Sequence, residues 1–170
     1  GPIQGTGSFV TPFPEFNPGC ATGLMLPSFP TPTYHVHLAE VEVDPVTGNV
    51  RVLRYVVAQE VGKVISPDGT YGQVAGGVTQ GIGYALHESL RIGEDGRYRE
   101  RTLESYRLPL APDVPRVEFV PLEHPDPDGP GGAKGVGESG SIGAPPAVAN
   151  AVCDALGHPA ANAAEHARVV

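Results

Sequence analysis

The most constraining feature of this sequence is a helical pattern that contains many glycines. In residues 72–90, apolar side chains recur at the spacing of one helix face, at Val74, Val78, Ile82 and Leu86. Four glycines lie inside the same stretch, at positions 76, 77, 81 and 83. Relative to alanine these glycines would cost about 3–4 kcal/mol of helix stability, so the fold must require bare backbone here. Either another element packs closely on the glycine side, or a ligand approaches the start of the helix.

A β-hairpin is predicted before this helix. Apolar and polar residues alternate imperfectly in residues 36–43, and residues 50–57 are β-branched and aromatic. Between them, residues 44–49 (DPVTGN) have the composition of a turn. We expect the second strand to continue through Val61 and to end at a break in residues 66–69 (SPDG).

The rest of the sequence predicts short elements. Residues 91–101 are typical of a charged hairpin turn, and residues 106–110 and 117–122 of two short strands. From Pro145 onward the sequence predicts a helix with proline in its first turn and Gly157 just past its end. The predicted fold class is therefore α+β, with a β-hairpin, short mixed strands, a glycine-rich helix and a C-terminal helix.

Three regions are expected along the chain. Residues 1–33 carry proline and glycine at short intervals and predict an extended arm, because proline removes ladder donors and interrupts helices. Residues 34–157 form one subdomain, and residues 158–170 form an alanine-rich tail. Glycine and proline occupy 42 of the 170 positions, but 40% of the residues are hydrophobic, which favours a loop-rich globular unit over disorder.

Charge and composition exclude several classes of function. The net charge of −8 argues against a surface that neutralises nucleic-acid phosphates. No stretch approaches the roughly 18 apolar residues of a membrane helix, and no export signal opens the chain. Cys20 and Cys153 are far apart, so neither a disulfide scaffold nor a thiolate zinc site is indicated. We therefore expect a cytoplasmic protein that binds neither nucleic acid nor membrane.

Residues 125–143 form a glycine-dense loop, which presents many backbone N–H groups and suits an anion or a developing oxyanion. Its GxGxxG match has no strand directly before it, and its Walker-like match has glycine where Ser or Thr must follow the lysine, so both nucleotide motifs fail. Glu138 is its one carboxylate after Asp128. Desolvation in such a loop would favour a general base near neutral pH; the alternative is an exposed glutamate with no role.

His35 and His37 are two residues apart on a predicted strand and therefore share a face. They could bind a metal with a third ligand, but a pair of partly exposed strand residues is the more common explanation. We assign no metal ligand in this sequence.

Five segments, in this order, resemble one known family: HLAEVEVDPVTG, QEVGKVISP, GQVAGGVTQGIGYAL, YRLPLAPDVP and GPGGAKGVGESGSIGAPPAVANAV. They are similar to the C-terminal part of the molybdopterin-binding large subunit of the xanthine dehydrogenase, aldehyde oxidoreductase and CO dehydrogenase family. The resemblance spans about residues 34–157. It implies a C-terminal portion of the molybdenum-binding domain, in an enzyme that hydroxylates aldehydes or N-heterocycles with oxygen from water.

The resemblance also implies roles for individual residues. Glu138 matches the family's active-site glutamate, which acts as general base. Gln73 matches a glutamine that hydrogen-bonds the pterin. Three further residues are expected to contact the cofactor, namely Gly135, Val136 and Gly137.

The sequence departs from many family members at a few of these motifs. Glu60 and Ser66 stand where Asp and Asn are common, and residues 139–140 are Ser-Gly where hydroxylases often have Pro-Pro. The Ser after the glutamate is shared with CO dehydrogenase-like chains. The departures therefore concern the class of substrate and not the glutamate itself.

The cofactor implied is molybdopterin or its cytosine dinucleotide form, with FAD and [2Fe-2S] clusters on partner chains or other segments. Implied partners are the remainder of the large subunit, iron-sulfur and FAD subunits, and a small-molecule substrate. Family large subunits are several times longer, so we expect this chain to be inactive alone and to self-associate through its arm and glycine faces. An alternative is a non-catalytic binding or assembly module derived from the same family.

Overall fold

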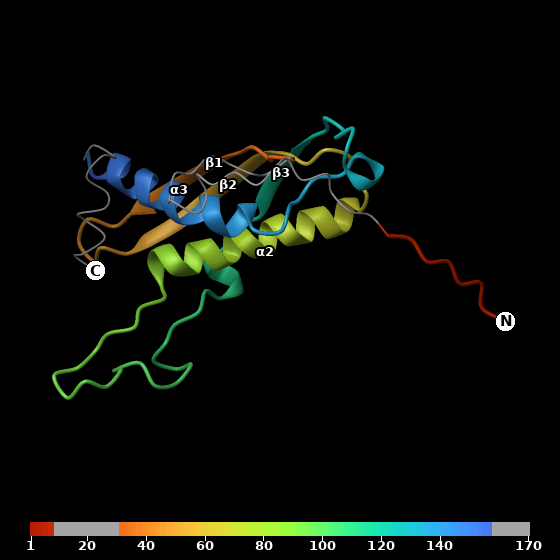
Figure 1. Ribbon diagram of the computed structural model, residues 1–170. Helices are drawn as coiled ribbons and strands as arrows, with labels where there is room; N and C mark the ends of the chain where they lie inside the picture. Colours follow the sequence, from red (N-terminus) through yellow and green to blue (C-terminus); the bar gives the residue numbers. More distant parts are fainter. Residues whose placement is uncertain (9–30, 158–170) are drawn as a thin grey trace, which may run out of the picture.

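The computed structural model describes residues 1–8 and 31–157 of the chain and shows a small α+β fold, as predicted (Figure 1). Most of the predicted arm (residues 9–30) and the predicted tail (158–170) lie outside the described residues. The main elements are β1 (His35–Val43), β2 (Val50–Glu60), α2 (Pro67–Leu86), β3 (Val117–Leu122) and α3 (Ser139–Ala155). Within the described ranges, neither helix is long and apolar enough to cross a membrane.

The sheet has three strands in the order β1-β2-β3. The predicted hairpin is confirmed, because β1 and β2 pair antiparallel, whereas β2 and β3 pair parallel. The turn is stabilised by the Asp44 carboxylate, which accepts hydrogen bonds from the Val46 N–H at 2.8 Å and the Thr47 hydroxyl at 2.7 Å. Gly48 has φ of +73°, which glycine adopts without steric cost.

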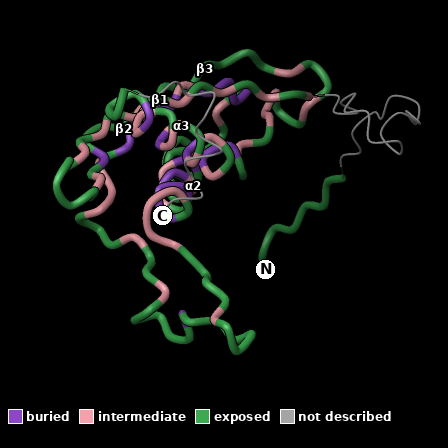
Figure 2. The backbone as a smooth tube through the Cα atoms, turned by 90° about the vertical axis from the view of Figure 1, so that its left-hand side faces the viewer, coloured by how far each residue is buried: buried purple, intermediate pink, exposed green. Residues whose placement is uncertain are grey.

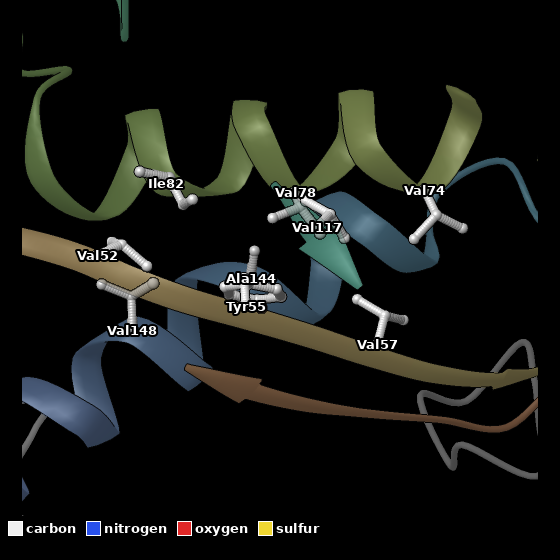
Figure 3. Packing of buried hydrophobic residues seen from close by; sticks show 9 residues of the cluster. All are labelled: Val52, Tyr55, Val57, Val74, Val78, Ile82, Val117, Ala144 and Val148. Carbon is white, nitrogen blue, oxygen red and sulfur yellow. The ribbon is translucent and has the colours of Figure 1, made fainter. Parts of the chain in front are cut away.

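Both helices lie on one face of the sheet, with α3 packed on β1 and α2 packed along α3 (Figure 1). Buried residues gather between these elements, whereas the long connection from α2 to β3 is mostly exposed (Figure 2). The core is a cluster of nine buried residues: Val52, Tyr55, Val57, Val74, Val78, Ile82, Val117, Ala144 and Val148 (Figure 3). The opposite face of the sheet is not covered by either helix.

The first helix begins earlier than the sequence pattern predicts. It starts at Pro67, inside the predicted break, and ends at Leu86. The Ser66 hydroxyl caps it by accepting a hydrogen bond from the Gly69 N–H at 3.2 Å. Pro67 suits the first position of a helix and Asp68 suits its positive end, so the predicted break is a helix start.

The last helix also begins earlier than predicted. It starts at Ser139, so Pro145 and Pro146 lie inside it and not in its first turn. The Ile142 N–H donates to the Glu138 carbonyl at 3.0 Å, which forms the first turn before the prolines. An interior proline removes a helical hydrogen bond, but Pro145 packs against α2 and so contributes to the contact between the helices.

The glycines of α2 mostly serve packing. A Cβ on Gly77 would lie 2.8 Å from the Ser141 nitrogen, and one on Gly81 would lie 2.9 Å from Cδ of Pro145. Bare backbone is therefore required where α2 meets α3, as one of the two explanations predicted. Gly76 faces open space and takes no part in this contact. Because Gly77 and Gly81 are covered by α3, they are not available for self-association, which stays a prediction for the arm and the exposed glycines.

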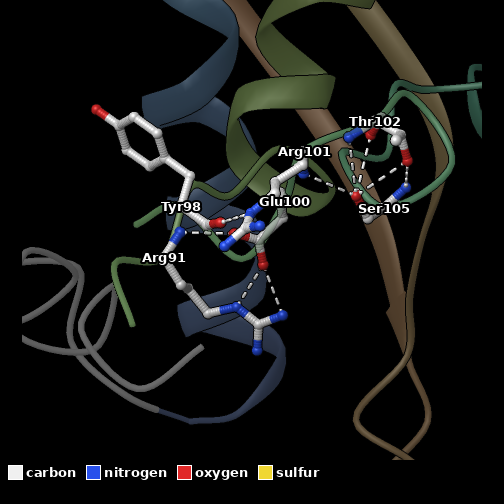
Figure 4. A network of polar contacts seen from close by, with 6 residues as sticks. All are labelled: Arg91, Tyr98, Glu100, Arg101, Thr102 and Ser105. Atoms are coloured by element: carbon white, nitrogen blue, oxygen red, sulfur yellow. Dashed lines mark hydrogen bonds and ion pairs between the residues drawn. The ribbon is translucent and has the colours of Figure 1, made fainter. Parts of the chain in front are cut away.

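The connection between α2 and β3 contains one predicted hairpin turn but not the predicted strand at residues 106–110. Ile92 and Tyr98 form an isolated antiparallel bridge. Arg91 donates to the Glu100 carboxylate from its backbone N–H at 2.7 Å and from Nε at 2.6 Å (Figure 4). The Tyr106 N–H donates to the Thr102 carbonyl in a turn, so residues 106–110 are not paired in a ladder.

Candidate functional site

The candidate site lies where β2 ends and α3 begins. We call residues 134–139 the Glu138 loop; it leads directly into α3. Glu138 is the last residue before the helix and is exposed, so it is not desolvated by this chain as the sequence argument expected. Within the described residues its carboxylate makes no hydrogen bond or ion pair, and the direction of the side chain depends on how the loop backbone is held.

The first turns of α2 bring Gln73 to the Glu138 loop. Its Nε2 donates to the carbonyl oxygen of Gly137 at 3.3 Å. Gln73 is exposed, and its position follows from the packing of α2 along α3. The structure therefore places Gln73 beside the loop that carries the other predicted site residues, although they are more than sixty positions away in the sequence.

Ser139, at the end of the Glu138 loop, is held by β2. Its hydroxyl donates to Oε1 of Gln59 at 2.6 Å, and both residues are buried. The other amide atom, Nε2 of Gln59, is buried without a partner in the described part of the chain. A buried donor of this kind costs free energy unless a further group accepts its hydrogen bond.

Lys134, at the start of the Glu138 loop, is held by the same strand. Its Nζ lies 2.8 Å from Oε2 of Glu60, and the two side chains are only 14% and 11% exposed. Burial alone would raise the pKa of Glu60, but hydrogen bonds from Lys134 and from the Gly62 N–H, together with the charge of Lys134, hold it below its usual value. The backbone N–H of Lys134 also donates to the Val61 carbonyl at 3.1 Å.

An open hollow of about 590 Å³ lies beside the loop. It is lined by residues 31–33, His35, residues 135–139 and Ile142. Among the described residues, no acceptor binds the backbone N–H groups of residues 135–138. Free donors on an open, glycine-lined wall suit an acceptor-rich anionic ligand, so these residues fit one side of a pterin cofactor.

Gly135, Val136 and Gly137, which the sequence analysis expects at the cofactor, form the middle of the Glu138 loop, and all three line this hollow. Gly135 and Gly137 are exposed, with open space where a Cβ would lie. Val136 differs from them, because it is half-buried. Its carbonyl oxygen is also a longer-range acceptor, at 3.4 Å, for the Ser139 hydroxyl that binds Gln59. The Val136 carbonyl thus has a partner within the loop. Contact of Gly135, Val136 and Gly137 with a cofactor stays a prediction.

The two histidines of β1, His35 and His37, contact different parts of the molecule. His37 Nδ1 lies 2.8 Å from the Tyr55 hydroxyl, and its ring packs against Gly143 of α3. Burial, and then the charge of His35, lower the pKa of His37 to about 4. His35 lines the hollow instead. Within residues 1–8 and 31–157, no group of three or more His, Cys, Asp or Glu side chains is placed to hold a metal.

Gln59, Glu60, Lys134 and Ser139 were not predicted from the sequence to hold the candidate site. A signal was present, because Gln59 and Glu60 are polar residues that directly follow the apolar run of residues 55–58. Lys134 and Ser139 directly flank the Gly-Val-Gly-Glu sequence. Only the three-dimensional pairing, however, shows which of these residues meet.

Comparison with known proteins supports the predicted family. The family model described as a molybdopterin cofactor-binding domain matches residues 1–115, a range that includes Gln73 but ends before the Glu138 loop. The 6-hydroxypseudooxynicotine dehydrogenase complex subunit gamma of Paenarthrobacter nicotinovorans is 44% identical over 124 residues, 72% of this chain and 16% of that protein. The aldehyde oxidoreductase molybdenum-binding subunit of Escherichia coli is 36% identical over 137 residues, 79% of this chain and 19% of that protein.

Solved structures show the same relationship. Quinoline 2-oxidoreductase from Pseudomonas putida 86 matches with a TM-score of 0.69 and 41% identity, over 71% of this chain and 15% of that one. CO dehydrogenase from Oligotropha carboxidovorans matches with a TM-score of 0.70 and 32% identity, over 74% and 16%. The chain thus spans less than a fifth of the length of these relatives. It belongs to the molybdopterin cofactor-binding domain family of molybdenum-containing oxidoreductases.

Proposed function

We propose that this chain is the part of a molybdenum-dependent hydroxylase or dehydrogenase that supplies the general base, Glu138, and one pterin contact, Gln73. The substrate class would be an aldehyde, an N-heterocycle or a similar small molecule. The relatives named for aldehydes and quinoline support this class. Because the chain covers only a small part of those relatives, it would be inactive alone.

The observation that supports this proposal best is the contact between Gln73 and the Glu138 loop. Gln73 Nε2 donates to Gly137 O at 3.3 Å, directly beside the residue proposed as base. A second donor hydrogen on the same amide remains available for an acceptor in the cofactor. A cofactor held by Gln73 and by the N–H groups of Gly135, Val136 and Gly137 would therefore lie next to the Glu138 carboxylate.

The chemistry requires a base at this place. Replacing a substrate C–H by C–OH with oxygen from water releases two protons and two electrons. The molybdenum cofactor, when bound, would accept the two electrons and present the oxygen. Glu138 would accept the proton lost by the attacking oxygen and would thereby raise the nucleophilicity of that oxygen. The exposed position of Glu138 on this chain leaves its carboxylate open to a substrate approaching from the hollow.

The partners follow from the same proposal. The cofactor would be molybdopterin or its cytosine dinucleotide form, and electrons would leave through FAD and [2Fe-2S] groups on other segments or chains. The remainder of the large subunit would cover the outer face of the sheet. Val36, Leu38 and Val120 are exposed there, and Val36 pairs through Ala58 with Val120 in one apolar row.

The decisive experiment replaces Glu138 by Gln in the full-length assembly. We expect turnover to fall by about 10²–10⁴-fold, because the base is lost while the side chain keeps its size. Molybdenum content, measured by mass spectrometry, should stay at the wild-type level. Asp128→Asn, an exposed carboxylate in the same glycine-rich stretch, is the matched control and should retain full turnover. Normal turnover in Glu138→Gln would exclude the base role and favour a non-catalytic assembly module.

A further inference from the structure

Both ends of the Glu138 loop are fastened to two consecutive residues of β2. Gln59 accepts the hydrogen bond from the Ser139 hydroxyl at 2.6 Å, and Glu60 forms the ion pair with Lys134 at 2.8 Å. Consecutive strand residues point to opposite faces of a sheet. Ser139 is therefore held on the helix-covered side and Lys134 on the other, so the loop wraps around the end of β2.

Between these two points the loop is held by hydrogen bonds to its carbonyl groups. The Ile142 N–H and the Ser141 hydroxyl donate to the Glu138 carbonyl, each at 3.0 Å, in the first turn of α3. The contact of Gln73 with Gly137 is longer, at 3.3 Å, and involves an exposed side chain. By contrast, the four residues of the two end contacts are buried or nearly so. A charge-assisted hydrogen bond between poorly solvated groups is stronger and shorter than a neutral exposed one. The hydrogen bonds to the Glu138 carbonyl tie Glu138 to the start of α3, and the contacts that Gln59 and Glu60 make fix both ends of the loop relative to β2.

We propose that Gln59 and Glu60, through Ser139 and Lys134, are positioning residues that fix where the Glu138 carboxylate stands. This inference rests on the proposed function, because it concerns the alignment of the same base. None of the four residues needs to touch the substrate. Their effect would be on the rate of the chemical step, because a displacement of about 1 Å in a reacting group can cost about 10²-fold in rate.

The test uses the full-length assembly with Lys134→Met and Ser139→Ala, each of which removes one end contact. We expect kcat to fall about 10–100-fold in each, with KM within about twofold and molybdenum content unchanged. Lys134→Arg, which keeps a cation opposite Glu60, should restore kcat to within about threefold of wild type. Arg91→Met is the matched control, because it removes another ion pair with a poorly exposed carboxylate, that of Glu100, away from the loop.

A second measurement does not depend on turnover. Amide hydrogen exchange at residue 134, whose N–H donates to the Val61 carbonyl, and at Ile142, whose N–H donates to the Glu138 carbonyl, is the readout. Exchange should accelerate at least about tenfold at position 134 in Lys134→Met and at Ile142 in Ser139→Ala, and should stay at the wild-type rate at both positions in Arg91→Met. Ser139→Ala removes a single hydroxyl, so it decides the matter if Lys134→Met does not assemble. Wild-type kcat together with wild-type exchange in these variants would overturn the inference.

Failure of the proposed function gives a different pattern. If Glu138→Gln keeps normal turnover, the base role fails and the positioning role fails with it, whatever hydrogen exchange shows. If Glu138→Gln is inactive but Lys134→Met and Ser139→Ala keep wild-type kcat, only the positioning role is overturned. Loss of kcat in all three variants, with rescue by Lys134→Arg, supports both.

Discussion

The contact between α2 and α3 and the Glu138 loop are neighbours in the fold but are held in opposite ways. The helices meet through bare backbone and small residues, at Gly77 and Gly81 on one side and Gly140 and Ala144 on the other. This contact is closely packed. The Glu138 loop is largely exposed and is fastened by a hydrogen bond and an ion pair.

The chain satisfies its own packing at the helix contact, but its described part leaves polar groups without partners at the Glu138 loop. Packing between α2 and α3 leaves no space for a Cβ at Gly77 or Gly81, so this contact is fully packed by residues of the chain itself. At the loop, backbone N–H groups and the Glu138 carboxylate have no partner in the described residues. A closely packed scaffold beside a site with free groups is consistent with a chain that spans less than a fifth of the length of its relatives.

The largest effect is expected at the helix contact. Gly81→Val would place a branched side chain against Ala144 and Pro145, in a position where even one Cβ is too close. Overpacking of this kind costs about 3 kcal/mol, so the variant should unfold at a much lower temperature or fail to accumulate. Scanning calorimetry of the protein measures the change.

Gly76→Ala provides the control on the same helix. Gly76 faces open space, so a methyl group meets nothing and the helix gains about 0.5–1 kcal/mol of intrinsic stability. Stabilisation of Gly81→Val, or destabilisation of Gly76→Ala, would contradict the assignment of α2's glycines to packing.

The sequence predicted the hairpin well, because its strand periodicity and its DPVTGN turn agree with each other. It misplaced both helix starts for a physical reason. The SPDG sequence is compatible with either a turn or a capped helix, and here the Ser66 hydroxyl caps a helix by accepting from the Gly69 N–H. In the same way, Pro145 inside α3 contradicts local propensity, and contacts with α2 compensate for it.

A second prediction concerns pH at the border between the two regions. The pKa of His37 is lowered to about 4, first by burial and then by the charge of His35. Between pH 6.5 and 4 the unfolded chain therefore binds a proton that the folded chain does not, so stability is complete above pH 6.5 and falls as the pH decreases. Because the ring is only half-buried, we expect a loss of about 1–2 kcal/mol across this range.

Urea denaturation at several pH values measures this loss. His37→Asn should flatten the dependence between pH 6.5 and 4, whereas His124→Asn, which removes an exposed histidine, should keep the wild-type slope. An unchanged slope in His37→Asn would mean that the acid sensitivity arises elsewhere.

The candidate site was predictable only in part. Gln73 and residues 135–138 came from motifs that resemble a known family, and the structure places them together. The residues that hold the loop, Gln59 and Glu60, could not be found in this way. A buried ion pair such as Glu60–Lys134 joins positions 74 residues apart and produces no periodic pattern in the sequence. Of the two alternatives for Glu138, a desolvated base or an exposed glutamate, the described residues leave it exposed, and its role stays a prediction.

The smallest effect on stability is expected at Gln73, where the two regions touch. Gln73→Ala removes one exposed hydrogen bond of 3.3 Å, so the free energy of unfolding should change by less than about 0.5 kcal/mol. If Gln73 holds the pterin, molybdenum content of the full-length assembly should nevertheless fall several-fold. Gln80→Ala is the matched control, because Gln80 is exposed on the same helix and bonds Tyr84 instead. Equal molybdenum content in both variants would assign Gln73 to loop support alone, and the cofactor would then be held by the loop N–H groups without it.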